Sequence, residues 1–390
     1  MLLLKLAYRN LMGAGARTWL SVLVLSLSYV VIIWMQGFLD GWNRQARRDM
    51  IQQEYGGGQY WHSQYDPYDP LSFEDSHAVV PAALMTPAGT GMVAPILIAP
   101  AAIYPQGRMQ NIVLKGIPPD QQVLALPTNP LAGQDTAIPA LIGERMARHA
   151  NLRVDDRVTV RWRDANGVFD AHDARIVHIM DTDVPAVDNG IFWVPIDRLR
   201  AMLQMPGEAT LVVVDQQHEP APVVAGWGFR DQEFLLKDFT AMIRMKNVGN
   251  WVMYAILLSL ALLAIFDIQV LSIFRRRREI GTLIALGMTR GRVIRLFTLE
   301  GMLHGVLAAI VGAVYGIPLL AWQAKAGFAM PEAVDSYGIA IADAIYPVYS
   351  LQLVAGTTFI VMVAVTVVSF MPTRRIAHLN PTDAIRGKVS

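Results

Sequence analysis

Apolar residues in this chain gather into four long runs, separated by stretches in which apolar and polar positions alternate. The runs lie at 18–38, 251–273, 297–322 and 349–371. An apolar helix of about 20 residues is long enough to cross the hydrocarbon core of a bilayer. We therefore predict an α-helical membrane protein with four transmembrane helices, one followed by three, and a large water-facing domain at 39–250.

Short segments of the large domain have the composition of β-strands: IVLKGI, RVTVRWR, ARIVHIM, GIFWVPI and TLVVVDQ. The segment ALIGERMARHANL, 140–152, is predicted to be a helix with Glu144, Arg145 and Arg148 facing outward. Asn166-Gly167 separates two strand-like segments, and this dipeptide is the strongest short signal for a β-hairpin. The domain is therefore expected to be mixed α/β.

Polar segments with a helical pattern flank this domain. DGWNRQARRDMIQQEY, 40–55, follows the first run and ends at three glycines, and 234–250 precedes the second run. We expect both to form helical stalks that connect the domain to the transmembrane helices. Residues 1–17 have apolar positions at helical spacing and are expected to form a short amphipathic helix on the inner membrane surface.

Composition narrows the function classes. Hydrophobic residues make up 53% of the chain and charged residues 17%, below the roughly 25% charged content of soluble domains. The net charge of +1 gives no reason to expect nucleic acid as a partner. The chain has no cysteine, no His-Glu-x-x-His and no Gly-x-Ser-x-Gly, so neither a metal site nor a catalytic residue is predicted.

Arginine and lysine near the ends of the apolar runs indicate the topology. They precede the first run, fill 274–296 and follow the fourth run in 372–390, whereas 323–348 contains only Lys325. Loops rich in these residues stay in the cytoplasm. We expect both termini and 274–296 in the cytoplasm, and 39–250 and 323–348 on the periplasmic side of a bacterial inner membrane.

The basic segment 274–300 reads FRRRREIGTLIALGMTRGRVIRLFTLE. Ile280, Leu283, Ile284 and Leu286 have the spacing of one helical face, and Gly287 is placed to end that helix. The pattern predicts a helix, a turn and a second helix that Thr289 caps. We expect the apolar face to contact a cytoplasmic partner; the alternative is a helix that lies on the lipid headgroups.

This segment resembles the cytoplasmic loop of the FtsX/MacB-like permeases. The family pattern is a basic run, Glu-Ile-Gly, Ala-Leu-Gly, a second basic stretch and a glutamate that opens the next helix. The matching residues are Arg278, Glu279, Ile280, Gly281, Ala285, Leu286, Gly287, Arg290, Arg292 and Glu300. The N-terminal LAYRNL and the closing PTRRIAHLNPTDAIR are also similar to the family, as is the order of one span, a large domain and three spans.

The resemblance implies a type VII (MacB-like) ABC permease that works as a pair, with a second copy or a related permease. It implies a coupling helix seated in an ABC-type ATPase dimer, formed here by Arg278, Glu279, Ile280, Gly281, Leu283, Ile284, Ala285, Leu286 and Gly287. The sequence has no Gly-x-x-x-x-Gly-Lys-Ser/Thr motif, so the separate ATPase is expected to bind ATP and Mg²⁺. We expect no cofactor and no enzymatic activity in this chain.

Within the family, the resemblance is nearest to the lipoprotein-releasing LolC/LolE-type permeases. It implies lipoprotein cargo, a periplasmic carrier and ATP-driven movement transmitted through the stalks. The hairpin in RWRDANGVFDAHDARIV lacks the proline-containing extension expected of a carrier-docking hook, which favours a LolE-like role or another relative. The alternatives are a MacB-like efflux permease and an FtsX-like regulator of a cell-wall hydrolase.

Polar residues inside the predicted spans are candidate functional residues by default. They are Asp267, Glu300 and His304. Because they lie near the cytoplasmic interface, hydrogen bonding between helices is favoured over a proton relay. A stripe of small residues in the third span predicts close helix packing and comprises Gly301, Gly305, Ala308, Gly312 and Gly316.

A further set lies near the outer leaflet in the first two spans: Trp34, Met35, Phe38, Met253 and Leu257. By family analogy, these residues line a cavity that receives lipid anchors, and methionine and aromatic side chains suit such an adaptable site. The alternative is that they face membrane lipids or pack against neighbouring helices.

Overall fold

The computed structural model describes residues 16–85, 93–133, 136–182, 184–216, 224–329 and 344–376. The chain divides into two compact units. Among the described residues, the first, the helical unit, comprises 16–43, 243–329 and 344–376; the second, the α/β domain, lies within 44–242. The amphipathic helix predicted for 1–17 lies almost entirely outside the described residues.

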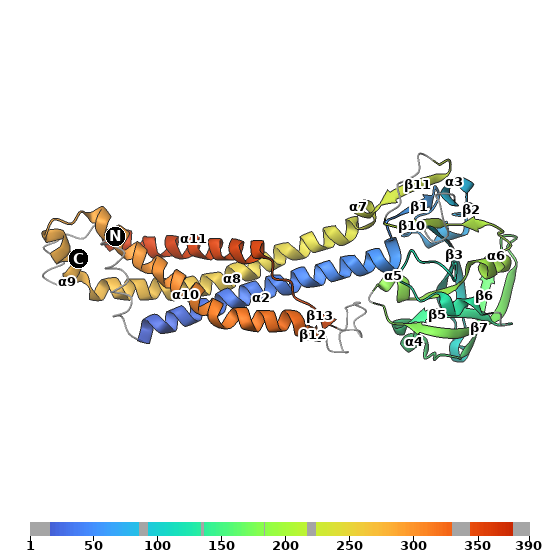
Figure 1. The fold of residues 1–390 in the computed structure, drawn as a ribbon, viewed down its shortest axis with the longest axis horizontal. Helices are drawn as coiled ribbons and strands as arrows, with labels where there is room; N and C mark the ends of the chain where they lie inside the picture. The colour runs from blue at the N-terminus through green and yellow to red at the C-terminus, as the bar shows by residue number, and fades with distance from the viewer. Residues whose placement is uncertain are drawn as a thin grey trace. The chain divides into compact units, whose positions relative to one another are not determined.

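Long helices make up the helical unit (Figure 1). They are α2 (Ala16–Met50), α8 (Lys237–Arg275), α10 (Arg290–Ala326) and α11 (Leu351–Ile376), and the short helix α9 (Arg277–Ala285) lies between α8 and α10 in the chain. Strands β12 (Phe328–Ala329) and β13 (Ala344–Ile345) pair antiparallel. Among the described residues, four helices are long and apolar enough to cross a membrane, which confirms the predicted number.

Two of these helices are much longer than a bilayer crossing requires. The apolar helical stretches Trp19–Tyr55 and Lys237–Arg275 contain 37 and 39 residues, against about 20 for a crossing. The first passes from α2 into one π-helical turn, η1 (Ile51–Tyr55), and stops at Gly56, whose φ of 58° breaks the helical path. Helix α7 (Gln232–Leu235) precedes the second. The helical character predicted for the two stalks is therefore confirmed.

Small residues on α10 allow its neighbours to approach closely. A Cβ added to Gly301 would lie 2.0 Å from the Ser369 Oγ on α11, and one added to Gly316 would lie 2.8 Å from a methyl group of Val30 on α2. Because no larger side chain fits at either contact, α10 packs tightly against both helices. The predicted small-residue stripe is confirmed as a packing surface.

The α/β domain is built on a nine-stranded sheet with the order β11-β1-β10-β3-β4-β8-β5-β7-β6 (Figure 1). The strands are β1 (Gly58–His62), β3 (Val93–Ile103), β4 (Gln110–Ile117), β5 (Ile138–Gly143), β6 (Arg157–Arg163), β7 (Phe169–Met180), β8 (Ile191–Pro195), β10 (Leu211–Val214) and β11 (Trp227–Asp231). The shorter elements are η2 (Pro70–Glu74), β2 (Ala78–Val79), α3 (Ala82–Met85), η3 (Pro105–Gly107), η4 (Asn129–Ala132), α4 (Glu144–Ala150), α5 (Pro185–Asp188), α6 (Ile196–Leu203) and β9 (Glu208–Ala209).

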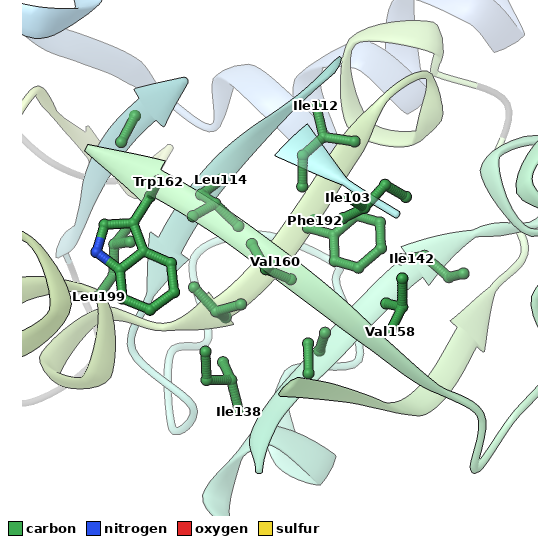
Figure 2. Packing of buried hydrophobic residues seen from close by; sticks show 14 of the residues in the cluster. Ile103, Ile112, Leu114, Ile138, Ile142, Val158, Val160, Trp162, Phe192 and Leu199 are labelled. Carbon is green, nitrogen blue, oxygen red and sulfur yellow. The ribbon is translucent and has the colours of Figure 1, made fainter. Parts of the chain in front are cut away.

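Strand β3 belongs to two parts of this sheet. Its first half pairs with β10, and its second half pairs with both β4 and β6. The second set of pairings closes six strands, β3-β4-β8-β5-β7-β6, into a ring. Their inward side chains fill the ring, as Figure 2 shows for Ile103, Leu114, Val160, Phe192 and others. Alternate residues of β6 are buried there, in agreement with its period-two pattern.

A second core covers the other face of the same strands. Trp193, Ile96 and Leu211 pack there against Leu124, which lies between β4 and η4, and against Val187 of α5. Trp193 is fully buried, and its Nε1 donates to the Val187 carbonyl at 2.9 Å. Successive residues of the central strands therefore contribute to different cores, which is why these strands are apolar without alternation.

One sequence prediction for this domain is wrong. The segment 140–152 is not a single helix, because its first residues form strand β5 and only Glu144–Ala150 are helical. Arg145 does not face solvent; its Nη1 donates to Asp188 Oδ2 at 3.2 Å, and Asp188 is completely buried. The Asn166-Gly167 hairpin between β6 and β7 is confirmed, with Gly167 at φ 81°.

Candidate functional site

The basic segment folds as a helix, a turn and a helix. Helix α8 ends at Arg275, Arg276 leaves the helical conformation, and α9 runs over Arg277–Ala285. Gly287 has a φ of 92°, a value that glycine adopts readily, and the turn therefore follows α9 directly. Thr289 occupies the N-cap position of α10 with an extended backbone. Its side chain makes no capping hydrogen bond, so the predicted capping bond is absent.

An apolar cluster under α9 attaches it to the adjoining helices. Ile280 packs with Ile273 of α8 and with Val293 and Phe297 of α10, while Ile284 and Met288 cover the cluster. Ile280 is only 4% exposed. The expectation that Ile280 contacts a partner directly is therefore corrected: its side chain fixes α9 to the rest of the chain.

The free surface of α9 lies elsewhere. Leu286 is 79% exposed on the isolated chain, and Ala285 and Gly287 beside it are also exposed. Arg278 and Glu279 are exposed at the beginning of the helix, whereas Gly281 is buried. The side chain of Leu283 lies outside the described residues. Single exposed apolar side chains are common on protein surfaces, so the exposure of Leu286 identifies the side of this turn that the chain itself does not cover.

Arg276 joins the three helices electrostatically. Its Nη1 donates to Glu300 Oε2 at 3.1 Å and its Nε donates to Glu279 Oε2 at 2.7 Å. The guanidinium also lies 5.3 Å from the centre of the Phe297 ring. In the sequence, this arginine indicates only the topology of the chain. The sequence signal for this role is a single glutamate, Glu300, in the apolar helix that follows the run of arginines.

The polar residues of the predicted spans make different contacts. The Glu300 side chain is 5% exposed and pairs with Arg276, and His304 Nδ1 lies 2.8 Å from the Glu300 carbonyl. Gln269 is buried near Gly301, whereas Asp267 is exposed on the isolated chain. Glu300 therefore takes part in the helix connections described above, and the structure does not bring Asp267 to it.

The outer-leaflet set is only partly assembled. The rings of Trp34 and Phe38 stack with their centres 6.0 Å apart, and Phe38 meets Phe328 edge to face at 5.7 Å. All five residues of the set are partly buried, including Met35, Met253 and Leu257. Packing of Trp34 against the cluster formed by α2, α8, α10 and α11 fixes one side of this group.

Comparison with known proteins identifies relatives of this chain. Residues 251–381 match the family of FtsX-like permease C-terminal domains. The lipoprotein-releasing system transmembrane protein LolC of Xylella fastidiosa is 20% identical over 394 residues, covering 94% of this chain and 92% of that protein. LolC of Neisseria meningitidis serogroup B is 21% identical over 324 residues, covering 75% and 77% of the two chains.

Similarity to an export protein is shorter. The macrolide export ATP-binding/permease protein MacB of Marinobacter nauticus is 24% identical over 161 residues, which cover 40% of this chain and 22% of MacB. The share of this chain that is similar to MacB is therefore smaller than the share that is similar to LolC. The C-terminal helices match a permease domain, and the likeness to LolC continues through most of the chain.

Proposed function

We propose that this chain, a permease subunit of an ABC transporter with an FtsX-like C-terminal domain, releases lipoproteins from the outer leaflet of the bacterial inner membrane. The observation that carries the proposal is the extent of the likeness to the lipoprotein-releasing protein LolC, which covers 94% of the chain. That likeness includes the α/β domain, whereas the likeness to MacB covers 40% of the chain. Efflux by a MacB-like route is the alternative.

ABC permeases work with ATPase subunits, and α9 is the surface that we assign to that contact. Leu286 and Ala285 would enter the ATPase, with Arg278 and Glu279 at the edge of the contact. Ile280 would act from beneath by holding α9 against α8 and α10. The partner ATPase would bind ATP and Mg²⁺, and this chain would contribute no catalytic group.

Force would pass through the helices themselves. In this proposal, closure of the ATPase dimer displaces α9, and the contacts of Ile280 and Arg276 transfer the displacement to α8 and α10. Helix α8 is continuous from Arg275 back to Lys237, and its first residues, up to Met242, belong to the α/β domain. A second copy or a related permease completes the pair, and Trp34, Phe38 and Met253 contribute to the place where the lipid anchor is held.

Release of a lipoprotein from vesicles tests this function. The chain is purified with the ATPase and the second permease that accompany it and is reconstituted with a triacylated lipoprotein. Addition of ATP should transfer the lipoprotein to a soluble carrier, and a non-hydrolysable ATP analogue should not. Transfer that is independent of ATP, or a complex that retains no lipoprotein, would contradict the proposal and favour efflux or regulation.

The proposed topology has its own test, which the absence of cysteine in the sequence makes simple. Single cysteines at Val168, on the exposed β6–β7 hairpin, and at Leu286 are labelled with a membrane-impermeant maleimide. With the α/β domain outside the cytoplasm, intact spheroplasts label the first position only. Labelling of the second position alone would reverse the orientation.

A further inference from the structure

The α/β domain contains a cavity of about 510 Å³ that the proposed function does not use. Small-molecule sites have volumes of roughly 300–1,000 Å³. Residues that follow α2 and residues around the start of α8 both line it, together with the outer face of the sheet. The lining includes Glu54, Trp61, Tyr65, Lys115, Trp193 and Phe234.

Aromatic rings form one wall of this cavity. The Trp61 ring meets Tyr65 edge to face, with centres 5.2 Å apart, and meets Phe234 in the same way at 5.9 Å. Ile96 and Leu211 of the sheet extend the apolar surface. Such a wall accommodates an apolar or aromatic group and strengthens the hold on a cation near the ring faces.

A carboxylate is set into the cavity by the π-helical turn. Glu54 Oε2 is buried and has no hydrogen-bond partner within 3.5 Å among the described residues, while the Tyr55 hydroxyl and the Lys115 ammonium both interact with the carboxylate group. Gln59 fixes the position of the turn, because its Nε2 donates to the Glu54 carbonyl at 2.8 Å and its Oε1 accepts from Trp61 Nε1 at 2.7 Å. An unpaired buried carboxylate oxygen is costly unless a donor satisfies it, so this position is suited to a cationic donor.

An ammonium group lies in the same cavity. Lys115 Nζ donates to the Ala186 carbonyl at 2.9 Å and lies 5.2 Å from the centre of the Trp193 ring. An ammonium has three donors, and the Ala186 carbonyl takes one of them. No ion pair within 4.0 Å joins Lys115 to Glu54 among the described residues, although each charge favours the ionised form of the other group. The Lys115 ammonium can therefore donate to a bound ligand, and the Glu54 carboxylate can accept from it.

The other charged residues of the lining have partners or lie towards the surface. Asp238 accepts a hydrogen bond from the Tyr68 hydroxyl, and Asp66 accepts one from the Tyr68 backbone N–H. Arg230 is exposed and lies over the rings of Trp61 and Phe234, and Lys237 is also exposed. The interior of the cavity thus presents one negative and one positive group, which suits a ligand that carries both charges.

We propose that this cavity binds a small zwitterion, a free amino acid with an apolar or aromatic side chain. Glu54 accepts hydrogen bonds from the ligand ammonium, and Lys115 donates to its carboxylate. The ligand side chain lies against Trp61, Tyr65 and Phe234. Because the lining comes from both ends of the domain sequence, the bound ligand contacts residues next to both long helices. This inference does not depend on lipoprotein release.

Titration of the purified full-length chain in lipid nanodiscs tests the proposal. L-Phenylalanine is the probe, and phenethylamine and 3-phenylpropanoate are matched compounds that lack the carboxylate and the ammonium. Calorimetry should show saturable binding of L-phenylalanine and binding at least tenfold weaker for each matched compound. Equal binding of either compound, or no saturable binding of L-phenylalanine, L-leucine or L-tryptophan, would overturn the proposal.

Substitutions locate the site. Glu54→Gln and Lys115→Met should each weaken binding of L-phenylalanine at least tenfold, whereas Glu74→Gln, outside the cavity, should leave it unchanged. Unaltered binding by either cavity variant would overturn the assignment. If a cavity variant does not fold, the comparison of the three probes on the unmodified chain still decides. Loss of lipoprotein release with intact amino-acid binding would reject the proposed function and leave this inference standing.

Discussion

Arg276 Nη1 lies 3.1 Å from Glu300 Oε2, and the same guanidinium lies 2.7 Å through its Nε from Glu279 Oε2. One side chain at the junction of α8 and α9 therefore binds carboxylates of both α9 and α10. The two pairs differ in environment, because the Glu300 side chain is 5% exposed and that of Glu279 is 63% exposed. The buried pair fixes α9 to its neighbours, and the exposed pair contributes little.

Arg276→Ala should destabilise the chain strongly because it removes the guanidinium that pairs with the buried Glu300 carboxylate. Breaking a buried ion pair costs about 3–5 kcal/mol. Glu279→Gln removes the exposed pair from the same arginine and should cost about 1 kcal/mol or less. Unfolding of the purified chain in detergent measures both. Arg276→Met combined with Glu300→Gln should recover much of the loss, and equal losses in Arg276→Ala and Glu279→Gln would refute the distinction.

Gly316→Ala should weaken packing between α10 and α2, since its new methyl group would meet a Val30 methyl group 2.8 Å away. Val30→Ala in the same chain should relieve this contact and restore the lost stability. Gly356→Ala on α11 is the matched control, because no atom lies within 4 Å of the added methyl group. Helix propensity alone favours alanine over glycine by about 1 kcal/mol, so the control should be neutral or stabilising. The observable is the unfolding midpoint of each variant, and failure of the double variant to recover would exclude a direct contact.

Asp188→Asn should destabilise the α/β domain. The carboxylate is fully buried and accepts from the backbone N–H groups of Arg145 and Met146, each at 3.1 Å, as well as from the Arg145 side chain. The amide keeps one acceptor and loses the charge, and we expect a loss of about 3 kcal/mol. Glu74→Gln, which removes an exposed pair with Arg163, should change stability by less than about 1 kcal/mol. Denaturant unfolding monitored by tryptophan fluorescence reports both values, and similar effects would be inconsistent with the burial of Asp188.

Lys115 gives the stability of the α/β domain a defined pH dependence. Burial lowers the pKa of Lys115, and the nearby Glu54 carboxylate offsets part of that effect. Between this lowered pKa and the ordinary value of about 10.4, the unfolded chain binds one more proton than the folded chain. The free energy of unfolding therefore gains a contribution that rises with pH in this window.

Comparison with Lys115→Met isolates this contribution. The unmodified chain should gain stability relative to the variant as the pH is raised from 7 towards 10. Urea unfolding at a series of pH values provides the measurement. A difference between the two proteins that stays constant, or that moves in the opposite direction, would show that the pKa of Lys115 is not lowered by burial.

The helical unit is easy to predict from the sequence, because a helix that crosses the hydrocarbon core needs an apolar run of about 20 residues. The small-residue stripe of α10 was also predictable, since close helix contact requires residues such as Gly301 and Gly316. The strand β5 was not, because a buried strand such as Ile138–Gly143 is apolar on both faces and has no alternation that separates it from a helix. A strand that is buried between two cores lacks the alternation of apolar and polar residues by which strands are recognised.

The functional residues show the same division. Exposed Leu286 followed from helical periodicity, but periodicity assigned Ile280 to the same free face although it packs on Val293 and Phe297. Helical spacing identifies an apolar face and cannot state which part of it the chain covers itself. Glu54 and Lys115 lie 61 positions apart in the sequence and are brought together only by folding, so no local pattern groups them. A lysine in the middle of the apolar strand IVLKGI was the one available signal.

The most direct measurement of the central claim is the amount of ATPase that co-purifies from membranes with a tagged Leu286→Asp variant. Leu286 is exposed and takes no part in the cluster under α9. The negative charge that the substitution introduces should therefore leave folding and membrane insertion intact. We predict that the unmodified chain retains its ATPase and that the variant retains less than a tenth as much. Undiminished ATPase on the Leu286→Asp variant would contradict the assignment of α9 as the surface that receives the movement of the ATPase.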